Sequence, residues 1–211
     1  MLQIESLLPG DTQTFDWSNC AIDVEFLPQS TPAETLRRRS QLAGRLTVQE
    51  RLEQHLINLP SLVSLFYDHR TGEAADYVAV TCSDDAIDIA LYHCKAAGGN
   101  AAGNRVGDVY EVAGQIVKSV FYCDVATLLA HMEDRLQARH TLPSRFVHGD
   151  LGLTRNAIQG VKQMNLRFAI VGVQPGIRRS LVDAKMADLM AFGINYAKQG
   201  GATNAWWLIS E

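Results

Sequence analysis

The spacing of apolar side chains in the first half of the chain predicts one helix followed by a run of strands. Over residues 47–59 apolar side chains recur at helical intervals, and Thr47 with Glu50 has the pattern of a capping box. Pro60 then ends the helix. Three short apolar or alternating runs follow, with tight polar turns between them, at residues 62–68, 74–81 and 86–95. These runs predict a three-stranded meander, and the alternation over residues 21–27 predicts a further strand.

The second half of the chain alternates between helical periods and strand-length apolar runs. Helical spacing predicts four helices, at residues 106–120, 125–139, 154–164 and 181–198. Thr154 is the expected cap of the third. Apolar runs predict strands over residues 167–173, closed by a Gln-Pro-Gly turn, and over residues 205–209. A meander followed by a helix and a later strand favours a mixed central sheet with helices on its faces, so the sequence predicts the α/β class.

Length and composition place the chain among ordinary globular proteins. It has 211 residues, of which 47% are apolar and 20% charged, enough for one domain or two small ones. We expect one domain, with a core over residues 46–175, a helix and strand over residues 181–211, and an N-terminal extension, residues 1–45, packed on them. The end of the chain directly after a predicted strand is also compatible with a domain cut from a longer polypeptide.

Charge and targeting signals narrow the expected setting. The net charge of −4 disfavours a globally basic nucleic-acid binder but not a local basic face. No apolar run approaches the roughly 20 residues of a membrane span, and the first residues lack the features of a secretory signal. We therefore expect a cytoplasmic protein without membrane contact. The four cysteines form no CxxC pair and are expected to be reduced thiols. The oligomeric state stays open, a homodimer included.

The strongest candidates for catalytic residues are Asp76, His93 and Lys95. On a strand, residues i and i+2 face the same side, so His93 and Lys95 are expected to point together. Pairing across the turn between the strands brings Asp76 towards them. This combination suits metal-assisted hydrolysis of a phosphodiester. A carboxylate holds a hard cation such as Mg²⁺, the cation lowers the pKa of a bound water, and a lysine adds positive charge near the water or the phosphate.

These residues and their order resemble the core of the PD-(D/E)xK nuclease superfamily, which has a restriction-endonuclease-like fold. The family pattern is helix, three-stranded meander, helix, strand, with an Asp on the second strand and (Asp/Glu)-x-Lys on the third. Asp76 in G-E-A-A-D-Y-V matches the first motif, and Cys94-Lys95 matches the x-Lys half of the second. The resemblance covers residues 46–175.

The resemblance implies further site residues, and the sequence departs from the family pattern at one position. It implies an acidic residue on the first helix, which Glu50 or Glu53 would match, and a glutamine on the following helix, which Gln115 in Y-E-V-A-G-Q would match. The carboxylate of (Asp/Glu)-x-Lys is replaced by His93. Imidazole suits transition metals better than Mg²⁺. The metal is then Mn²⁺ or another softer ion, or the site is inactive, or the carboxylate comes from elsewhere, for instance from Glu73 or Glu111.

Two further segments carry a resemblance that concerns partners. L-Y-H-C-K with G-D-V-Y-E-V-A-G-Q, and I-V-G-V-Q-P-G, are similar to nuclease-like domains attached to bacterial helicases, including those of phage defence. This implies a helicase or another defence-system subunit as a partner. Basic residues near the expected groove predict contacts with DNA phosphates by Arg105, Arg178 and Arg179.

Together these features predict a metal-dependent nuclease that hydrolyses phosphodiester bonds in DNA, with Mg²⁺ or Mn²⁺ as its cofactor. The predicted catalytic residues are Asp76, His93, Lys95 and Gln115. The predicted metal ligands are Asp76, His93, Glu53 and Glu73. Two alternatives stay open. One is a module that kept the fold, lost the chemistry, and binds nucleic acid or docks a partner protein. The other is an unrelated small-molecule enzyme.

Overall fold

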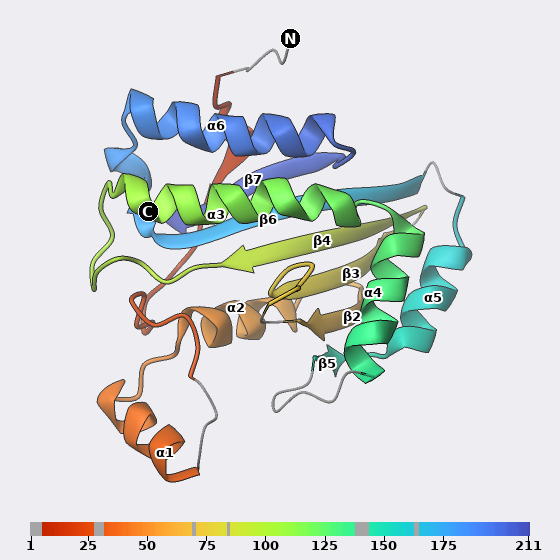
Figure 1. Ribbon diagram of the computed structural model, residues 1–211, viewed down its shortest axis with the longest axis horizontal. Helices are drawn as coiled ribbons and strands as arrows, with labels where there is room; N and C mark the ends of the chain where they lie inside the picture. The colour runs from red at the N-terminus through yellow and green to blue at the C-terminus, as the bar shows by residue number, and fades with distance from the viewer. Residues whose placement is uncertain (1–5, 28–31, 69–70, 84, 138–143, 163–164) are drawn as a thin grey trace.

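The computed structural model describes residues 6–27, 32–68, 71–83, 85–137, 144–162 and 165–211. Within this part of the chain, seven strands form one mixed sheet in the order β1-β7-β6-β4-β3-β2-β5 (Figure 1). The strands are β1 (Thr12–Thr14), β2 (Leu62–Tyr67), β3 (Tyr77–Ser83), β4 (Ala86–Cys94), β5 (Arg145–His148), β6 (Leu166–Arg178) and β7 (Asn204–Ser210). The predicted α/β class with a mixed central sheet is confirmed.

Strand directions bring two loops to one edge of the sheet. β2, β3 and β4 form the predicted antiparallel meander, and β6 lies beside β4 in parallel. β7 is parallel to β6, and the N-terminal β1 is parallel to β7. Because β4 and β6 run the same way, their C-terminal ends lie at the same edge. The loop after β4 accordingly meets the end of β6, where the N–H of Gly103 donates to the carbonyl of Gly176 at 2.8 Å.

Helices cover both faces of the sheet. They are α1 (Pro32–Gln41), α2 (Val48–Leu56), α3 (Val106–Ser119), α4 (Val125–Gln137), α5 (Leu151–Gln159) and α6 (Ala184–Gln199). α3 and α6 lie side by side over β6 and β7, and α4 with α5 covers β2, β3 and β4 on the same face (Figure 1). α2 packs on the opposite face, where its Leu52 and Leu56 are fully buried. Side chains along β3 alternate between the two faces of the sheet, so Tyr77 packs in the layer of α2 and Val78 in the layer of α4.

The start of α2 is fixed by its own sequence. Thr47 caps the helix, its hydroxyl oxygen accepting a hydrogen bond from the N–H of Glu50 at 3.2 Å. The carboxylate of Glu50 accepts in return from the N–H of Thr47 at 2.9 Å. The predicted capping box is therefore confirmed, and it orients α2 towards the site described below.

Residues 21–27 do not form the predicted strand. Their backbone instead satisfies the start of α2, because the N–H groups of Val48 and Gln49 donate to the carbonyls of Val24 and Glu25 at 2.9 and 3.0 Å. The first N–H groups of a helix have no partner inside the helix, so an extended segment that offers carbonyls can bind there. Alternation alone cannot distinguish such a segment from a strand, and the strand prediction is wrong.

Other predicted boundaries shift for local reasons. α5 begins at Leu151 because Asp150, and not Thr154, is its cap, accepting from the N–H of Leu153 at 2.7 Å. Thr154 lies inside that helix, where its hydroxyl donates to the carbonyl of Asp150 at 2.7 Å. α6 begins three residues later than predicted, capped by Asp183. The predicted helix ends at Arg139 and Met164 lie outside the described residues.

β6 continues through the Gln-Pro-Gly turn that was expected to close it. The side-chain oxygen of Gln174 accepts from the N–H of Gly176 at 2.8 Å, and the register with β7 shifts between Gln174 and Arg178. A proline is tolerated in a strand at such an irregularity. Sequence periodicity also missed β1, α1 and β5, which are short or strongly polar.

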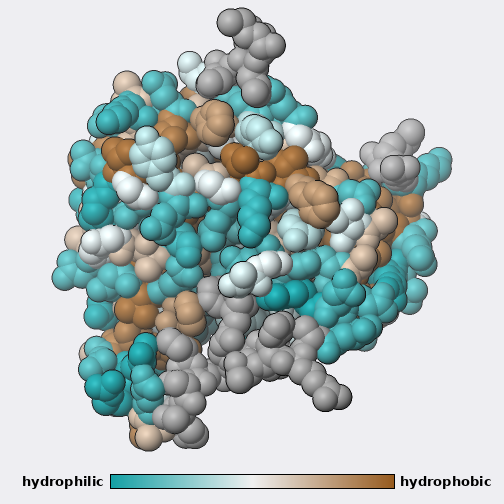
Figure 2. Space-filling model, viewed as in Figure 1, coloured by the Kyte–Doolittle hydropathy of each residue, from teal (hydrophilic) through white to brown (hydrophobic). Residues whose placement is uncertain are grey.

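A membrane-spanning helix requires both length and apolar character. Over the described residues, no single helix has the length and apolar character needed to cross a membrane. Among the described helices, one pair, Val106–Tyr122 and Val125–Gln137, reaches the required length and apolar composition when taken together, but it is bent by 106°. The face that carries α3, α4 and α6 is mostly hydrophilic and is interrupted by hydrophobic patches (Figure 2). All four cysteines are free thiols.

Candidate active site

Three charged side chains meet at the C-terminal end of β4. Lys95 Nζ lies 3.2 Å from Glu25 Oε2 and 3.3 Å from Glu25 Oε1. The N–H of Cys94 donates to Asp76 Oδ2 at 2.7 Å, and the N–H of Ala96 donates to Glu25 Oε2 at 3.4 Å. The two carboxylates therefore flank the same stretch of backbone, with Lys95 between them. Glu25, Asp76 and Lys95 are called the β4-end cluster below.

Strand pairing explains the position of Asp76. β3 begins at Tyr77, which pairs with Tyr92, so β4 runs two residues past the start of its neighbour. The side chain of Asp76 takes the place of a strand partner by accepting from Cys94. Its other oxygen accepts from Gln49 Nε2 on α2 at 2.7 Å. A carboxylate that is only 1% exposed needs such hydrogen bonds, and these hold Asp76 between β4 and α2.

Backbone geometry places both carboxylates on one side of β4. The N–H of Lys95 points the other way and donates to Val173 of β6 at 3.1 Å. The amides of Cys94 and Ala96, which the carboxylates accept from, both face the β3 side. Amides two residues apart in extended chain are separated by roughly 6.6 Å. The two carboxylates are thus close enough for their charges to interact.

Negative charge predominates in the β4-end cluster. Burial raises the pKa of Glu25 and the charge of Asp76 raises it further, while Lys95 acts in the opposite direction. Burial alone would lower the pKa of Lys95, but Glu25, Asp76 and Glu111 raise it overall. The lysine therefore stays protonated. Two carboxylates thus share one lysine, and like charge disfavours the ionised form of each carboxylate.

His93 lies outside the β4-end cluster, in the layer between β4 and α3. It is 2% exposed, and its Nε2 is hydrogen-bonded to Ser119 Oγ. The Ser119 hydroxyl donates to the carbonyl of Ala74 at 2.8 Å, so Nε2 of His93 must supply the proton of its own bond. Nδ1 then carries the lone pair and has no hydrogen-bond partner among the described residues. Burial lowers the pKa of His93 to about 4, so the imidazole is neutral at pH 7.

One side of α3 faces the end of β4. Gln115 lies one turn before Ser119, and its Oε1 is buried with no hydrogen-bond partner within the described part of the chain. Glu111 lies one turn earlier and is exposed. Its charge contributes to the raised pKa of Lys95. Residues four apart share a helix face, so Glu111 and Gln115 lie on the side of α3 from which Ser119 contacts His93.

The remaining predicted metal ligands are dispersed. Glu53 on α2 accepts a hydrogen bond from Tyr77 Oη at 3.0 Å. Glu73 is half-buried before β3; burial is the main cause of the raised pKa of Cys94, and the charge of Glu73 contributes a smaller part. Over the described residues, no three His, Cys, Asp or Glu side chains are grouped closely enough to hold a metal ion by themselves. Asp76, His93, Glu53 and Glu73 are thus not gathered as one ligand set.

The predicted basic residues lie at the same edge of the sheet as the β4-end cluster. Arg178 and Arg179 are exposed at the end of β6, and the N–H of Arg178 donates to the carbonyl of Gly103 at 2.9 Å. Arg105 is partly committed elsewhere, since its Nε donates to Asp108 Oδ2 at 3.0 Å. Arg178 and Arg179 therefore offer the more accessible positive charge.

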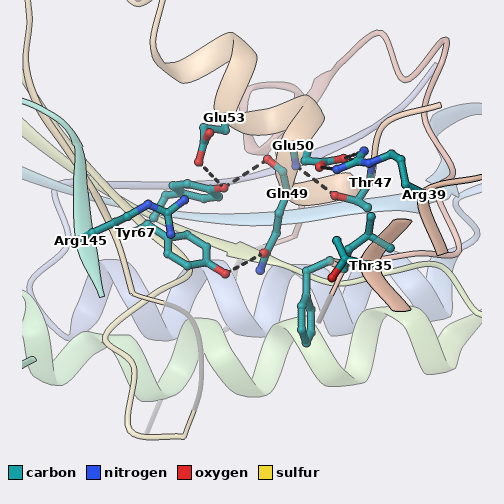
Figure 3. Close-up of a pocket in the computed structure, with 11 residues that line it drawn as sticks. Thr35, Arg39, Thr47, Gln49, Glu50, Glu53, Tyr67 and Arg145 are labelled. Atoms are coloured by element: carbon teal, nitrogen blue, oxygen red, sulfur yellow. Dashed lines mark hydrogen bonds and ion pairs between the residues drawn. The ribbon is translucent and has the colours of Figure 1, made fainter. Parts of the chain in front are cut away.

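A pocket of about 190 Å³ opens beside the cluster, between α1, α2 and the edge of the sheet at β2 and β5 (Figure 3). Tyr67 and Tyr77 line its sheet side, with ring centroids 5.3 Å apart. The guanidinium carbon of Arg145 lies 4.8 Å from the centre of the Tyr67 ring. Gln49 belongs to both sites, because its Oε1 accepts from Tyr67 Oη at 3.4 Å while its Nε2 donates to Asp76.

Sequence reasoning missed two residues of this region. Glu25 lies in the segment that was interpreted as a strand, where an acidic side chain in an apolar run was the available signal. Gln49 precedes Glu50 on the helix for which the family resemblance implies an acidic residue. The contacting residue there is an amide, and it binds Asp76 instead of competing with it for a cation.

The groups at this edge define the available chemistry. Two carboxylates supply oxygen ligands, a protonated lysine supplies fixed positive charge, and a polar pocket adjoins both. No family model, no curated protein and no solved structure matches this chain. The class of reaction is therefore inferred from these groups and from the topology that positions them.

Proposed function

We propose that the protein is a metal-dependent nuclease that hydrolyses phosphodiester bonds in DNA, with the β4-end cluster as its active site. The observation behind the proposal is the position of Glu25, whose carboxylate lies 3.2 Å from Lys95 and accepts an amide two residues beyond the one that Asp76 accepts. A carboxylate at this point replaces the one that His93 displaces from the (Asp/Glu)-x-Lys pattern.

The order of elements supports the same proposal. α2, the meander β2–β4, α3 and β6 come in the order helix, meander, helix and strand, with α4, β5 and α5 inserted between α3 and β6, and β6 lies beside β4. This is the order that the PD-(D/E)xK resemblance implies. We therefore propose a restriction-endonuclease-like core, in which the chain positions Asp76 at the start of the second strand of the meander and Lys95 just past the third.

The donor set fits a hard divalent cation. Mg²⁺ is commonly held through one or two carboxylates, with waters and substrate phosphate oxygens as the other ligands. Asp76 and Glu25 are therefore sufficient without a third protein ligand. The cation, when bound, lowers the pKa of a water and stabilises charge on the phosphate. Because both donors are oxygens, we expect Mg²⁺ to be preferred and Mn²⁺ to substitute for it.

The side chains of the protein orient the reacting groups and compensate the negative charge of the phosphates. Hydrogen bonds from Gln49 and Cys94 fix Asp76 in advance, so its carboxylate needs little reorganisation during the reaction. Lys95 stays protonated and holds a phosphate oxygen or the attacking water. Gln115 orients water or substrate through its unbonded carbonyl oxygen. Arg178 and Arg179, with Arg105, bind flanking phosphates.

The setting follows from the same resemblance. We propose a cytoplasmic enzyme that works with a helicase or another subunit of an antiviral defence system. The DNA that such a partner unwinds would reach the edge of the sheet where β4 and β6 end.

Cleavage by matched variants tests the proposal. Labelled single-stranded, linear duplex and circular DNA are incubated with the purified protein in EDTA, Mg²⁺ or Mn²⁺. We expect cleavage only with metal, and a loss of about a hundredfold or more in Lys95→Met, Asp76→Asn and Glu25→Gln. Glu133→Gln is the matched control, because that carboxylate is 45% exposed on α4 and pairs with Arg155. Metal-dependent cleavage that survives all three substitutions, or no cleavage by the wild type, overturns the proposal.

An inactive DNA-binding module is the second candidate. It is favoured by the burial of Asp76, both of whose oxygens already accept hydrogen bonds, and by the ion pair of Lys95 with Glu25. Such a module binds DNA equally well in EDTA and in Mg²⁺, and its affinity falls steeply with salt. Lys95→Met leaves that binding unchanged, whereas Arg178→Ala weakens it.

A further inference from the structure

The pocket beside the β4-end cluster shares its walls with the cluster. Each carboxylate is followed in the chain by an aromatic residue that lines the pocket, Glu25 by Phe26 and Asp76 by Tyr77. Gln49 lines the pocket and donates to Asp76. Consecutive Cα atoms are about 3.8 Å apart. The pocket therefore adjoins the β4-end cluster.

Flat surfaces and hydrogen-bonding groups together line the pocket. Tyr67 and Tyr77 present aromatic rings, and the guanidinium of Arg145 lies over Tyr67 (Figure 3). The polar lining includes the hydroxyl of Thr47, which caps α2, the amide of Gln49, which is hydrogen-bonded to Tyr67 and Asp76, and the carboxylates of Glu50 and Glu53. Aromatic rings and arginine planes stack nucleobases, while amides and hydroxyls bond base edges. The lining thus suits a nucleobase better than it suits an aliphatic or purely anionic group.

The size of the pocket restricts what enters it. Its volume of about 190 Å³ lies below the roughly 300–1,000 Å³ of a typical small-molecule site. One flat ring fits, and the rest of the ligand must lie outside, as the rest of a polymer does. Arg145 is exposed at the rim and supplies positive charge for the adjoining phosphate.

We propose that this pocket receives one unpaired base of the substrate strand, so that the nuclease acts on single-stranded DNA or frayed ends. This inference rests on the proposed function and adds the substrate class. A base within a duplex is paired and stacked, and it enters such a pocket only after it is flipped out. The pocket therefore selects against intact duplex directly beside the cleaved bond.

Binding without metal tests the pocket separately from cleavage. A short single strand that carries one 2-aminopurine is titrated with the protein in EDTA, and its fluorescence falls when the base stacks in the pocket. We expect Arg145→Ala to abolish this decrease and to weaken single-strand binding roughly tenfold. Arg155→Ala is the matched control, since Arg155 is 39% exposed on α5 and pairs with Glu133. Tyr67→Leu tests the ring independently.

The outcomes separate the two proposals. Loss of quenching and of single-strand preference in Arg145→Ala, with neither lost in Arg155→Ala, supports the base pocket. A wild type that cleaves duplex and single strands equally, or an Arg145→Ala variant that keeps the quenching, overturns the pocket while the nuclease stands. A wild type that quenches 2-aminopurine but never cleaves supports the pocket and overturns the nuclease. A wild type that neither binds nor cleaves overturns both.

Discussion

Asp68 and Asp76 are two buried carboxylates that lie side by side, since the N–H of Asp68 donates to the carbonyl of Asp76 at 3.0 Å, and their side chains have different partners. Asp68 follows β2 and is fully buried among donors and cations: His131, Arg135, Ser144 and the N–H of Ala74. Burial alone would raise the pKa of Asp68, but these hydrogen bonds lower it overall. Every hydrogen bond to Asp68 thus favours the ionised carboxylate. We call this carboxylate saturated, because hydrogen-bond donors and cations surround both of its oxygens.

The hydrogen bonds described above for Asp76 differ in kind from those of Asp68. They come from the neutral groups of Gln49 and Cys94, and Glu25 and Asp76 share Lys95. Burial is the main cause of the raised pKa of Glu25, and the charge of Asp76 contributes to it. The comparison teaches that burial alone does not identify a functional carboxylate. A saturated carboxylate stabilises the fold, whereas a pair with too little positive charge retains capacity for a cation.

The largest expected effect breaks the saturated network. Asp68→Asn leaves the guanidinium of Arg135, only 12% exposed, without its anionic partner. Removing one member of a buried pair costs about 3–5 kcal/mol. Asp76→Asn loses one hydrogen bond and costs about 1–3 kcal/mol. Urea unfolding of both variants measures the difference. Equal destabilisation would contradict the distinction drawn between the two carboxylates.

A pH titration tests the segment around Ala74, which lies between Asp68 and Asp76 in the sequence. Ala74 is held on one side by Asp68 and on the other by Ser119, which His93 supports. The folded pKa of His93, about 4, lies below its ordinary 6.5, so protons bind preferentially to the unfolded chain. Stability is therefore complete above pH 6.5 and falls as the pH drops towards 4, by on the order of 3 kcal/mol.

The His93→Gln variant provides the control for that titration. Glutamine can still donate to Ser119 but does not titrate, so the free energy of unfolding should lose most of its slope between pH 6.5 and 4. An unchanged slope would show that other groups produce the acid sensitivity.

The fold was predictable where backbone pairing imposes a period. The meander and its parallel neighbour follow from alternation and turns, and they bring Asp76 and Lys95 together because strand pairing is nearly determined by turn length. Glu25 was not predictable in this way. Its segment is bound by the start of α2, and a contact between a loop and a helix terminus has no sequence period. The role of His93 was also hidden, since only tertiary packing reveals that it faces Ser119.

Metal binding should change the free energy of unfolding by a smaller amount, and only through the β4-end cluster. Mg²⁺ that binds the folded β4-end cluster raises the free energy of unfolding by about 2.7 kcal/mol at a hundredfold excess over its Kd. Glu25→Gln should abolish this gain. The folded pKa of Glu25 is raised, so its contribution to stability is present below the ordinary pKa of about 4.3 and is lost as the pH rises. At pH 7 without metal, the variant should therefore be at least as stable as the wild type. Thermal unfolding with and without Mg²⁺ measures both quantities.

The variants with the smallest expected change in stability should differ in cleavage activity, and so distinguish the surroundings of Asp76 from those of Asp68. Ser144→Ala and Gln49→Met each remove a neutral hydrogen bond to a buried carboxylate, Asp68 in the first case and Asp76 in the second. Each also removes a longer bond that the side chain accepts, from Arg135 Nε at 3.2 Å and from Tyr67 Oη at 3.4 Å. Each should cost only about 0.5–1.5 kcal/mol, because other donors remain. Cleavage should nevertheless fall at least tenfold in Gln49→Met, since Asp76 loses the contact that orients it, and stay at the wild-type level in Ser144→Ala. Equal cleavage by the two variants, at equal stability, would mean that the orientation of Asp76 is irrelevant to the reaction.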